Sequence, residues 1–442
     1  MNTAPPIPGP VKNIDFPDVP RNRLDNGLEI ICIEDHRLPK ISVVLGIPSG
    51  RMHDPEGKRG IAQLTADMLQ EGTEKRTSHQ IAGELDQLAI DFRCRVFLEY
   101  TLIYCKFLES FHDQALELLS DIVLNASMPE EEWAKAVIRW KGYLAAQAAN
   151  PAYLARERIY REIYPGSPLS NVTVDPATLD ILAPDDLLDF HRKRLSPDKG
   201  IVGFSGPVSD DGSRAAAGRF LGSSGIPGSA GPCVPRIAPL KSRVHLIDRP
   251  GSQQARILVG LLAPARKEAD PMPLKLLSQA YGGGGSSRIF MNLREEKGYT
   301  YGAYSYLKQN NYSGTFFVST SVNNGVVRES LREIFREMDL IRRVKLSTEE
   351  LDRCKAEING SFLRQMETPS SICSMEVTRH LVGLPDNYYS EFLPKLMAVG
   401  REEVRRAAES ILDPCRAMVV VVGDRKQLGS EEEIEKYCFP DA

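Results

Sequence analysis

Two hydrophobic runs, each with a glycine at or next to its end, predict buried strands in distant parts of the chain. The runs are Ile201–Gly206 and Met418–Asp424, and their continuous apolar character is typical of strands covered on both faces. Two further strands are expected to enter from turns, at Leu38–Gly46 and at Ser252–Gly260. Each half of the chain therefore has one strand near its start and one buried strand at its end.

Helical segments repeat between the two halves in the same order. A helix that begins near Pro129 and another that begins near Ser347 both carry acidic residues in the first turn, which is a helix-start signal. Matching landmarks lie 220, 218 and 217 residues apart: Lys135 and Lys355, Pro151 and Pro369, and Gly206 and Gly423. Because these offsets are nearly constant, we predict a duplicated α+β domain.

The segment between the two halves has the composition of a linker. Residues 207–239 are dense in Gly, Ser, Ala and Pro, and only a short helix near 215–221 is expected within them. The predicted divisions are a proline-rich extension at 1–20, a first domain at 21–206, the linker at 207–239 and a second domain at 240–442.

Composition and charge exclude several classes of function. The 442 residues are 42% hydrophobic and 26% charged, as in an ordinary globular protein. A net charge of −4 and the absence of a Lys/Arg run argue against binding to nucleic acid. No apolar stretch reaches the length of a membrane-spanning helix.

The cysteines and the N-terminus bear on the compartment. The eight cysteines are scattered and include no Cys-x-x-Cys pair, so we expect neither a zinc ribbon nor a redox motif. Free buried cysteines suit a reducing compartment. The first twenty residues have no apolar core of a signal peptide. The expectation is a cytoplasmic protein, or a periplasmic one if a leader was trimmed.

A glycine run and the segment after it form the most specific pattern in the chain. Gly282, Gly283, Gly284 and Gly285 predict a loop that permits close backbone approach. An amphipathic helix is expected from Ile289, ended by Gly298, and then a strand over Tyr299–Tyr306. This arrangement places Arg294 near the helix end and Tyr301 at the start of the strand, so a cation and a phenol lie beside the loop.

Simpler readings of this segment must be weighed. A phosphate-binding loop requires a Lys-Ser or Lys-Thr pair that is missing here. A dinucleotide site would follow a strand, whereas this run follows a predicted helix at 273–281. Arg294 alone could be a surface charge near a helix end, and Tyr301 alone could be a core residue of a strand.

The stretch from Gly282 through Leu293-Arg294-Glu295-Glu296-Lys297-Gly298 to Tyr301 resembles the second half of the pitrilysin-like (M16) metallopeptidases. The resemblance extends over about residues 22–424. It implies two related domains, each an antiparallel-rich β-sheet packed with α-helices, in the LuxS/MPP-like metallohydrolase fold. It also implies that Arg294 and Tyr301 reach into a zinc site from the other half of the molecule.

The first half departs from the family at the zinc motif itself. Active members carry His-x-x-Glu-His on a helix, where two histidines bind zinc and the glutamate activates water. In the matching segment, Gly60 to Thr73, Gln63 and Asp67 replace the histidines and Ala66 replaces the glutamate. An amide is a poor zinc ligand beside an imidazole, and alanine accepts no proton.

The downstream metal ligand of the family is missing as well. The helix after Pro129 offers Glu131 and Glu132 only in its first turn, and the deeper positions 139–142 read Arg-Trp-Lys-Gly. The seven histidines include no i, i+4 pair. We therefore expect no metal in this chain.

These observations favour a non-metal subunit of a heterodimeric M16B peptidase. The partner is then a zinc-bearing M16B chain, and a peptide is the substrate. Tyr301 would donate a hydrogen bond to the developing oxyanion, and Arg294 would add positive charge or orient the substrate. Two alternatives remain open: a structural homologue resembling the core subunits of respiratory complexes, and a homodimer that binds peptide without cleaving it.

Overall fold

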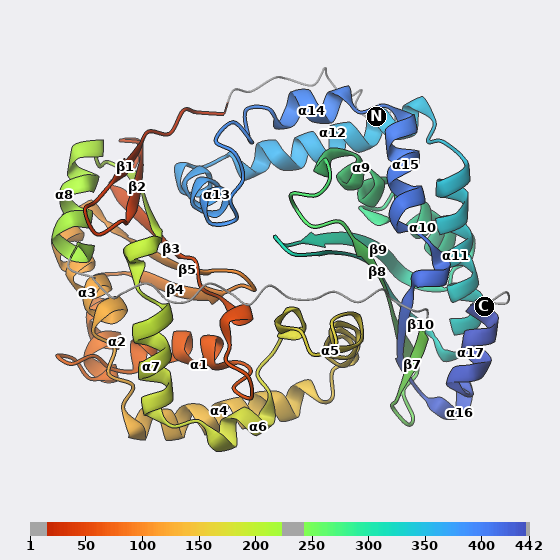
Figure 1. Cartoon of the computed structure of the whole chain (residues 1–442), viewed down its shortest axis with the longest axis horizontal. Helices are drawn as coiled ribbons and strands as arrows, with labels where there is room; N and C mark the ends of the chain where they lie inside the picture. The colour runs from red at the N-terminus through yellow and green to blue at the C-terminus, as the bar shows by residue number, and fades with distance from the viewer. Residues whose placement is uncertain (1–15, 223–242, 439–442) are drawn as a thin grey trace, which may run out of the picture.

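The computed structural model describes residues 16–222 and 243–438, which form two mixed sheets covered by helices (Figure 1). The strands of the first half are β1 (Arg21–Arg23), β2 (Glu29–Glu34), β3 (Lys40–Ile47), β4 (Asp91–Val96), β5 (Thr101–Leu108) and β6 (Ile201–Gly206). Its helices are α1 (Ile61–Met68), α2 (Ser78–Gln87), α3 (His112–Leu124), α4 (Glu130–Gln147), α5 (Pro151–Ile163), α6 (Pro176–Ile181), α7 (Pro184–Arg194) and α8 (Asp210–Leu221).

The second half repeats this order of elements. Its strands are β7 (Arg243–Asp248), β8 (Gln254–Ala263), β9 (Thr300–Gln309), β10 (Gly314–Asn323) and β11 (Met418–Gly423). Its helices are α9 (Pro271–Gly282), α10 (Arg288–Phe290), α11 (Val327–Arg343), α12 (Thr348–Gln365), α13 (Pro369–Leu381), α14 (Phe392–Ala398), α15 (Arg401–Ile411), α16 (Arg425–Leu428) and α17 (Glu431–Cys438).

Strand order confirms the predicted duplication. The first sheet runs β1-β2-β6-β3-β5-β4 and the second runs β7-β11-β8-β10-β9. In both sheets a parallel pair, β2–β6 or β7–β11, is joined to antiparallel neighbours. The predicted buried strands at β6 and β11 lie inside the sheets, fully covered. The α+β class with two homologous domains is therefore confirmed.

One helix of each half packs on the sheet of the other half. Helix α5 packs on β8 and β11 of the second sheet, and α13 packs on β2, β3 and β6 of the first. A Cβ at Gly260 would lie 2.7 Å from Ile163 of α5, and a Cβ at Gly203 would lie 2.3 Å from Cys373 of α13. Glycine in these strands thus permits the close helix approach.

The tips of two hairpins form a further contact between the halves. The carboxylate of Glu99, in the β4–β5 turn, lies 3.2 Å from the guanidinium of Arg266. Its other oxygen accepts a 2.9 Å hydrogen bond from the backbone N–H of Asn311 in the β9–β10 turn. Arg266 also donates to the carbonyl oxygen of Gln309 at 2.7 Å. Exchanged helices and paired turns together join the two domains.

The structure corrects one predicted boundary. Residues 210–221, inside the predicted linker, form helix α8, which packs on β2 of the first sheet. Its length exceeds the short helix expected near 215–221. Residues 223–239 of the predicted linker and residues 1–15 of the predicted N-terminal extension lie outside the described residues.

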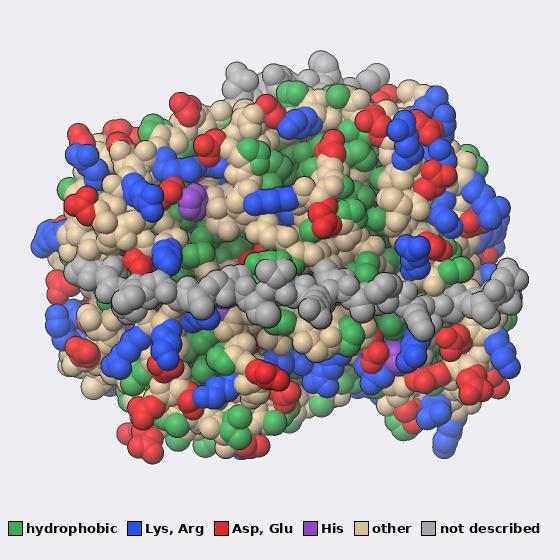
Figure 2. All heavy atoms as spheres, viewed as in Figure 1, with side chains coloured by type: hydrophobic (Ala, Val, Ile, Leu, Met, Phe, Trp, Pro, Cys, Tyr) green, Lys and Arg blue, Asp and Glu red, His purple; other side chains and the backbone are tan. Residues whose placement is uncertain are grey.

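One face of the molecule shows no concentration of one charge. On the face drawn in Figure 2, acidic and basic side chains are interspersed over both halves. Across residues 16–222 and 243–438, no helix is both long enough and apolar enough to cross a membrane.

Candidate functional site

Helix α1 carries the positions at which the first half departs from the zinc motif. Its apolar side chains enter the core of the first domain, and Ala66 is buried among them. Gln63 and Asp67 are more exposed, and the Gln63 Nε2 donates to the Asp67 Oδ1 at 2.8 Å. From α4, the Trp140 Nε1 donates to the Asp67 Oδ2 at 3.1 Å. The structure brings these three polar side chains together, and they bind one another.

The charged residues around this cluster are also paired. Arg139 of α4 donates to the carboxylate of Glu71 at 2.6 Å. The Lys135 amine lies 2.9 Å from Glu131 and 3.1 Å from Glu132. The first-turn carboxylates of α4 are therefore held by a lysine on the same helix. The deeper positions of α4 supply an indole and a guanidinium to the cluster, where a metal ligand would be required.

The environment of Asp67 shifts its acidity. Asp67 retains exposed surface, yet protein atoms crowd its carboxylate, and the resulting loss of hydration raises its pKa to about 6. The hydrogen bonds from Gln63 and Trp140 act in the opposite direction, as does the charge of Arg139. At neutral pH the Asp67 carboxylate is therefore ionised and accepts hydrogen bonds from Gln63 and Trp140.

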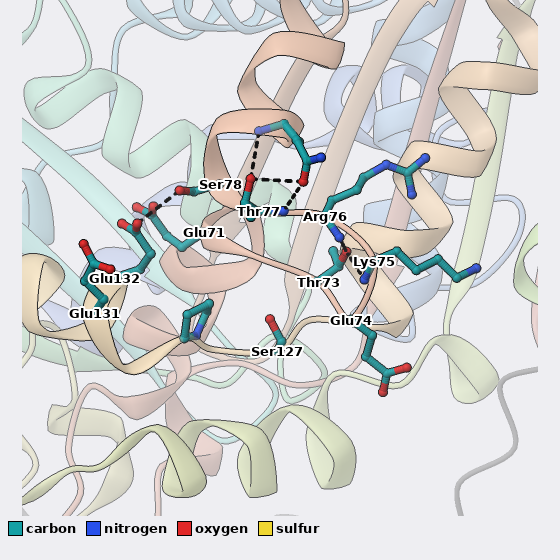
Figure 3. A pocket seen from close by; sticks show the side chains of 12 residues that line it. Glu71, Thr73, Glu74, Lys75, Arg76, Thr77, Ser78, Ser127, Glu131 and Glu132 are labelled. Carbon is teal, nitrogen blue, oxygen red and sulfur yellow. Dashed lines mark hydrogen bonds between the residues drawn. The ribbon is translucent and has the colours of Figure 1, made fainter.

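A hollow of about 340 Å³ opens beside this cluster, between the end of α1, the start of α2 and the first turn of α4 (Figure 3). Its lining includes Glu71, Glu131 and Glu132, each paired as described above, and Arg76, which lies 2.7 Å from the carboxylate of Asp121. Four acidic and two basic side chains line the hollow in all. Because three of the acidic side chains are paired with cations of α4, the negative field that a charged ligand would meet is reduced.

The donor set on α1 does not fit zinc. It consists of one amide and one carboxylate already bound by two donors, whereas zinc in proteins takes imidazole, thiolate or free carboxylate ligands. In the part of the chain that the structure describes, no group of three or more His, Cys, Asp or Glu side chains is arranged to hold a metal ion. That the protein carries no zinc stays a prediction.

The glycine run begins inside a helix and ends in a short loop. Gly282 is the last residue of α9, and a Cβ there would lie 2.3 Å from the backbone nitrogen of Ser305. Glycine at this position lets α9 rest directly on β9, which is the close approach that the sequence predicts. A Cβ at Gly284 or Gly285 would lie 3.7 Å or more from its nearest neighbour. Packing therefore does not require glycine at these two positions.

Side chains of helix α12 bind residues on both sides of the glycine loop. The carboxylate of Glu357 accepts hydrogen bonds from Gln279 at 2.6 Å and from the hydroxyl of Ser286 at 3.0 Å. Arg288 forms a bidentate pair with Glu350 at 2.8 and 2.9 Å. These contacts hold both ends of the glycine loop against the helix.

Arg294 lies on an unusual helix. The predicted amphipathic segment forms α10 and continues as a π-helix over Met291–Glu296, a form often found at functional sites. The Arg294 guanidinium lies 4.9 Å from the ring centroid of Phe290 and 3.5 Å from Glu295, and its side chain is 47% exposed. Gly298 ends the segment with a φ of +65°, as a C-terminal glycine should.

Tyr301 lies on a bulge of an edge strand. Thr300 pairs with Val322 and Ala303 pairs with Thr320, so two residues of β9 stand opposite one residue of β10. A bulge of this kind redirects a side chain and is frequent beside active sites. Tyr301 is 86% exposed, which excludes the reading of this tyrosine as a core residue. Neither hydrogen bond nor ion pair joins it to Arg294.

Sequence reasoning missed the residues that shape both regions. The hydroxyl of Thr300 donates to the carbonyl of Ser321 at 2.7 Å, and that of Thr320 donates to the carbonyl of Gly302 at 3.0 Å, so two threonines hold the bulge. The Thr-x-Gly sequence before the strand interior was the available signal. The sequence identifies Trp140 only as a residue that cannot bind a metal. Its hydrogen bond to Asp67 was missed because the two residues are 73 positions apart in the chain.

Comparisons with known proteins agree with this architecture. Residues 29–177 match the family described as insulinase (peptidase family M16), and residues 182–358 match the family described as peptidase M16 inactive domain. The chain is 27% identical over 347 residues to an uncharacterized zinc protease of Rickettsia felis, covering 78% of this chain and 83% of the relative. It is 22% identical over 404 residues to the uncharacterized zinc protease YmxG of Bacillus subtilis, covering 91% and 98%.

Solved structures give the same fold. A crystal structure of a peptidase M16 inactive domain from Pseudomonas fluorescens superimposes with a TM-score of 0.86 at 22% identity, covering 92% of this chain and 98% of the other. A protease from Helicobacter pylori gives 0.85 at 18% identity, covering 92% and 100%. With both halves matched by models of one family on a shared two-domain fold, the chain belongs to the M16 peptidase family.

Proposed function

We propose that this chain is the non-metal subunit of a heterodimeric M16B zinc peptidase and that Arg294 and Tyr301 complete the active site of its partner. One observation carries the proposal. The Tyr301 phenol is 86% exposed on a bulged edge strand, and no hydrogen bond engages it within residues 16–222 and 243–438. An exposed phenol held by a specific backbone irregularity is suited to an external ligand.

The polar groups on α1 support the same assignment, in which the partner holds the metal and this chain does not. Gln63, Asp67 and Trp140 bind one another, so these side chains of α1 and α4 leave no open coordination position among them. A zinc ion held by the partner would supply the polarised water. The present chain would then contribute hydrogen-bond donors and positive charge rather than the metal or the base.

Tyr301 and Arg294 have the chemistry that peptide hydrolysis requires on the carbonyl side. The Tyr301 hydroxyl would donate to the carbonyl oxygen of the scissile bond as negative charge develops on it. Arg294 is only partly engaged, by the Phe290 ring and by Glu295, and would add positive charge or orient the substrate backbone. Donors of this kind act mainly on the transition state.

Strand β9 supplies a means of holding the peptide. It is the last strand of its sheet, and among the described residues only β10 pairs with it. The outer edge of such a strand presents N–H and C=O groups that an extended peptide can pair with. Tyr301 lies at the start of this edge, so a bound peptide backbone would pass close to it.

Reconstitution tests the proposal. The purified chain alone is expected to bind no stoichiometric zinc and to leave a quenched fluorescent peptide uncut. Addition of an M16 chain from the same organism that bears His-x-x-Glu-His should produce activity that saturates at equal molar amounts. A partner with Gln in place of the motif glutamate is the matched control, and it should assemble without cleaving.

Three outcomes would count against this function. Stoichiometric zinc in the isolated chain, measured by inductively coupled plasma mass spectrometry, would overturn the assignment as the non-metal subunit. Cleavage by the chain alone would do the same. Peptide binding without activation of any such partner would instead favour the structural or peptide-binding alternatives.

A further inference from the structure

A cleft of about 560 Å³ is lined mainly by residues of α9, α12, α13 and β9 in the second half. The β4–β5 turn of the first half closes one side through Tyr100, beside the Glu99–Arg266 contact. The cleft therefore sits at the junction of the two domains, next to the edge strand proposed to hold a peptide. Neither Arg294 nor Tyr301 lines it.

The internal duplication relates this cleft to the zinc-motif region. In element order, α9 follows β8 as α1 follows β3, and α12 corresponds to α4. Lys275 and Gln279 are one turn apart on α9, as Gln63 and Asp67 are on α1. In the first half the indole of Trp140 closes this place, whereas in the second half the aliphatic Ile358 of α12 lines an open cleft.

Lys275 is an uncompensated cation in the wall of this cleft. It is half-buried, and it forms no ion pair with any residue of 16–222 or 243–438. Its Nζ lies 5.7 Å from the ring centroid of Phe392. Burial lowers the pKa of the Lys275 amine, and nearby Arg266 lowers it further. A buried ammonium without a counter-ion is costly, and an anionic ligand would relieve that cost.

Two other polar residues that line the cleft, Arg266 and Gln279, already have partners. Arg266 is bound to Glu99 and to the carbonyl of Gln309, and Gln279 donates to Glu357 at 2.6 Å. Lys275 is thus the cation on this wall that is left to pair with a ligand. A single unpaired positive charge matches the one negative charge of a carboxylate better than the two negative charges of a phosphate dianion.

Several aromatic side chains also line the cleft. Those lining it include Tyr100, Phe362, Tyr388, Tyr389 and Phe392, and the Phe362 and Phe392 rings stack with centroids 4.4 Å apart. Such walls bind apolar groups, while a few polar groups fix the orientation of a ligand. The cleft thus places an unpaired cation beside several aromatic side chains, among polar residues such as Ser361 and Gln365.

We propose that this cleft binds an apolar carboxylate through Lys275, either the C-terminal residue of a peptide lying along β9 or a free carboxylic acid of similar size. The proposal rests on the peptide-handling role argued above and adds a recognition site for the end of the chain. The Lys275 Nζ would pair with the carboxylate, and the aromatic walls would enclose the terminal side chain.

Calorimetric titration of the full chain alone tests this proposal, with no zinc partner present. The probes are an N-acetylated peptide that ends in phenylalanine with a free carboxylate, the same peptide as its C-terminal amide, and N-acetylphenylalanine. The free acid should bind at least about tenfold more tightly than the amide, because a charge-assisted pair is lost in the amide. Lys275→Met should abolish that difference.

Lys395→Met is the matched control. Lys395 lies on α14 with its amine 2.6 Å from Glu391, and the site is more than half exposed, so the acid–amide difference should survive its loss. If Lys275→Met fails to fold, Lys275→Gln serves the same purpose. A melting temperature of the Lys275 variant equal to or above that of the wild type would show that the fold is intact.

Each outcome bears on the proposal. Binding of both the free-acid peptide and N-acetylphenylalanine supports the site and identifies the carboxylate residue as sufficient. Binding of the peptide alone supports recognition of a chain end. Equal affinities for acid and amide, no binding of either, or an acid–amide difference that persists without Lys275 would overturn it. Because no partner is present, these results are independent of whether reconstitution succeeds.

Discussion

The polar residues on α1 and those that follow the glycine loop differ in how their hydrogen-bonding capacity is used. On α1, Asp67 accepts from Gln63 and Trp140, and the surrounding carboxylates are paired with Lys135 and Arg139. After the loop, Tyr301 extends into solvent from a bulge. In the first region the polar side chains form hydrogen bonds and ion pairs with one another. In the second region the Tyr301 hydroxyl remains able to donate to an external group.

This difference separates a structural use of polar residues from a functional one. A satisfied cluster stabilises the helix pair that carries it, so its loss should lower stability. An exposed donor stabilises nothing in the isolated chain, so its loss should leave stability unchanged and alter only the activity of the assembled complex. Mutations at the two regions should therefore change different quantities.

Removing the exposed donor should have the largest effect. Tyr301→Phe is expected to lower the turnover of the reconstituted complex by about 100-fold or more, which is typical of the loss of one oxyanion donor. Its melting temperature should match that of the wild type, because the hydroxyl has no hydrogen-bond partner among residues 16–222 and 243–438. Steady-state kinetics on a fluorogenic peptide, together with thermal unfolding, measures both.

Tyr304→Phe is the control for this change. Tyr304 lies on the same strand and packs its ring 5.9 Å from that of Phe290, and its hydroxyl is not assigned a role. The Tyr304 variant should retain the wild-type rate. A Tyr301 variant with normal turnover, or one that unfolds at lower temperature, would remove the functional reading of the bulge.

Two arginines in neighbouring turns should differ in their effect on stability. Arg288 and Glu350 are mostly buried and form a bidentate pair, so Arg288→Ala should lower the free energy of unfolding by about 2–3 kcal/mol. Arg294 is exposed, and Arg294→Ala should change it by less than about 0.5 kcal/mol. Urea unfolding of the two variants compares them. Similar losses would show that Arg294 is a structural residue too.

The smallest effect concerns the pH dependence of stability. The pKa of Asp67 is raised to about 6 in the folded chain, so its contribution to stability is present at low pH and is lost as the pH rises toward about 6. Asp67→Asn removes this titration. The melting temperature of the variant, relative to wild type, should therefore be higher at about pH 7 than at about pH 4.5.

Asp35→Asn provides the opposite case. Hydrogen bonds from Arg37 lower the pKa of Asp35 to about 2, so its contribution is lost only as the pH falls below about 4. The difference between this variant and the wild type should stay constant from about pH 4.5 to about pH 7. A similarly flat profile for Asp67→Asn would contradict the shift attributed to crowding around Asp67.

Local signals predicted much of the fold. Continuous apolar runs gave the buried strands β6 and β11, because a strand covered on both faces leaves no polar alternation. Gly298 gave the end of the segment that carries Arg294. The exchange of α5 and α13 was not predictable, because both helices begin with a proline after a similar helix and nothing local specifies which sheet covers them.

The sequence names Arg294 and Tyr301 as candidate residues, and their role stays a prediction; their geometry could not be predicted. The order of Arg294 and Tyr301 along the chain is a sequence property. The bulge beneath Tyr301 depends on the register between β9 and β10, and that register is set by pairs twenty residues apart. The Asp67–Trp140 hydrogen bond likewise joins α1 to α4, and side-chain contacts across such separations leave no periodic signal.

The exchanged helices have a consequence for synthesis on the ribosome. The strands of the first sheet are complete at Gly206, yet the helix that covers their outer face begins only at Pro369. At about 5–20 residues per second, roughly 10–30 s pass between the two. Throughout that interval Ile31, Val44 and Ile201, which α13 later buries, face water on the nascent chain. The first domain therefore finishes folding only when most of the second has been translated.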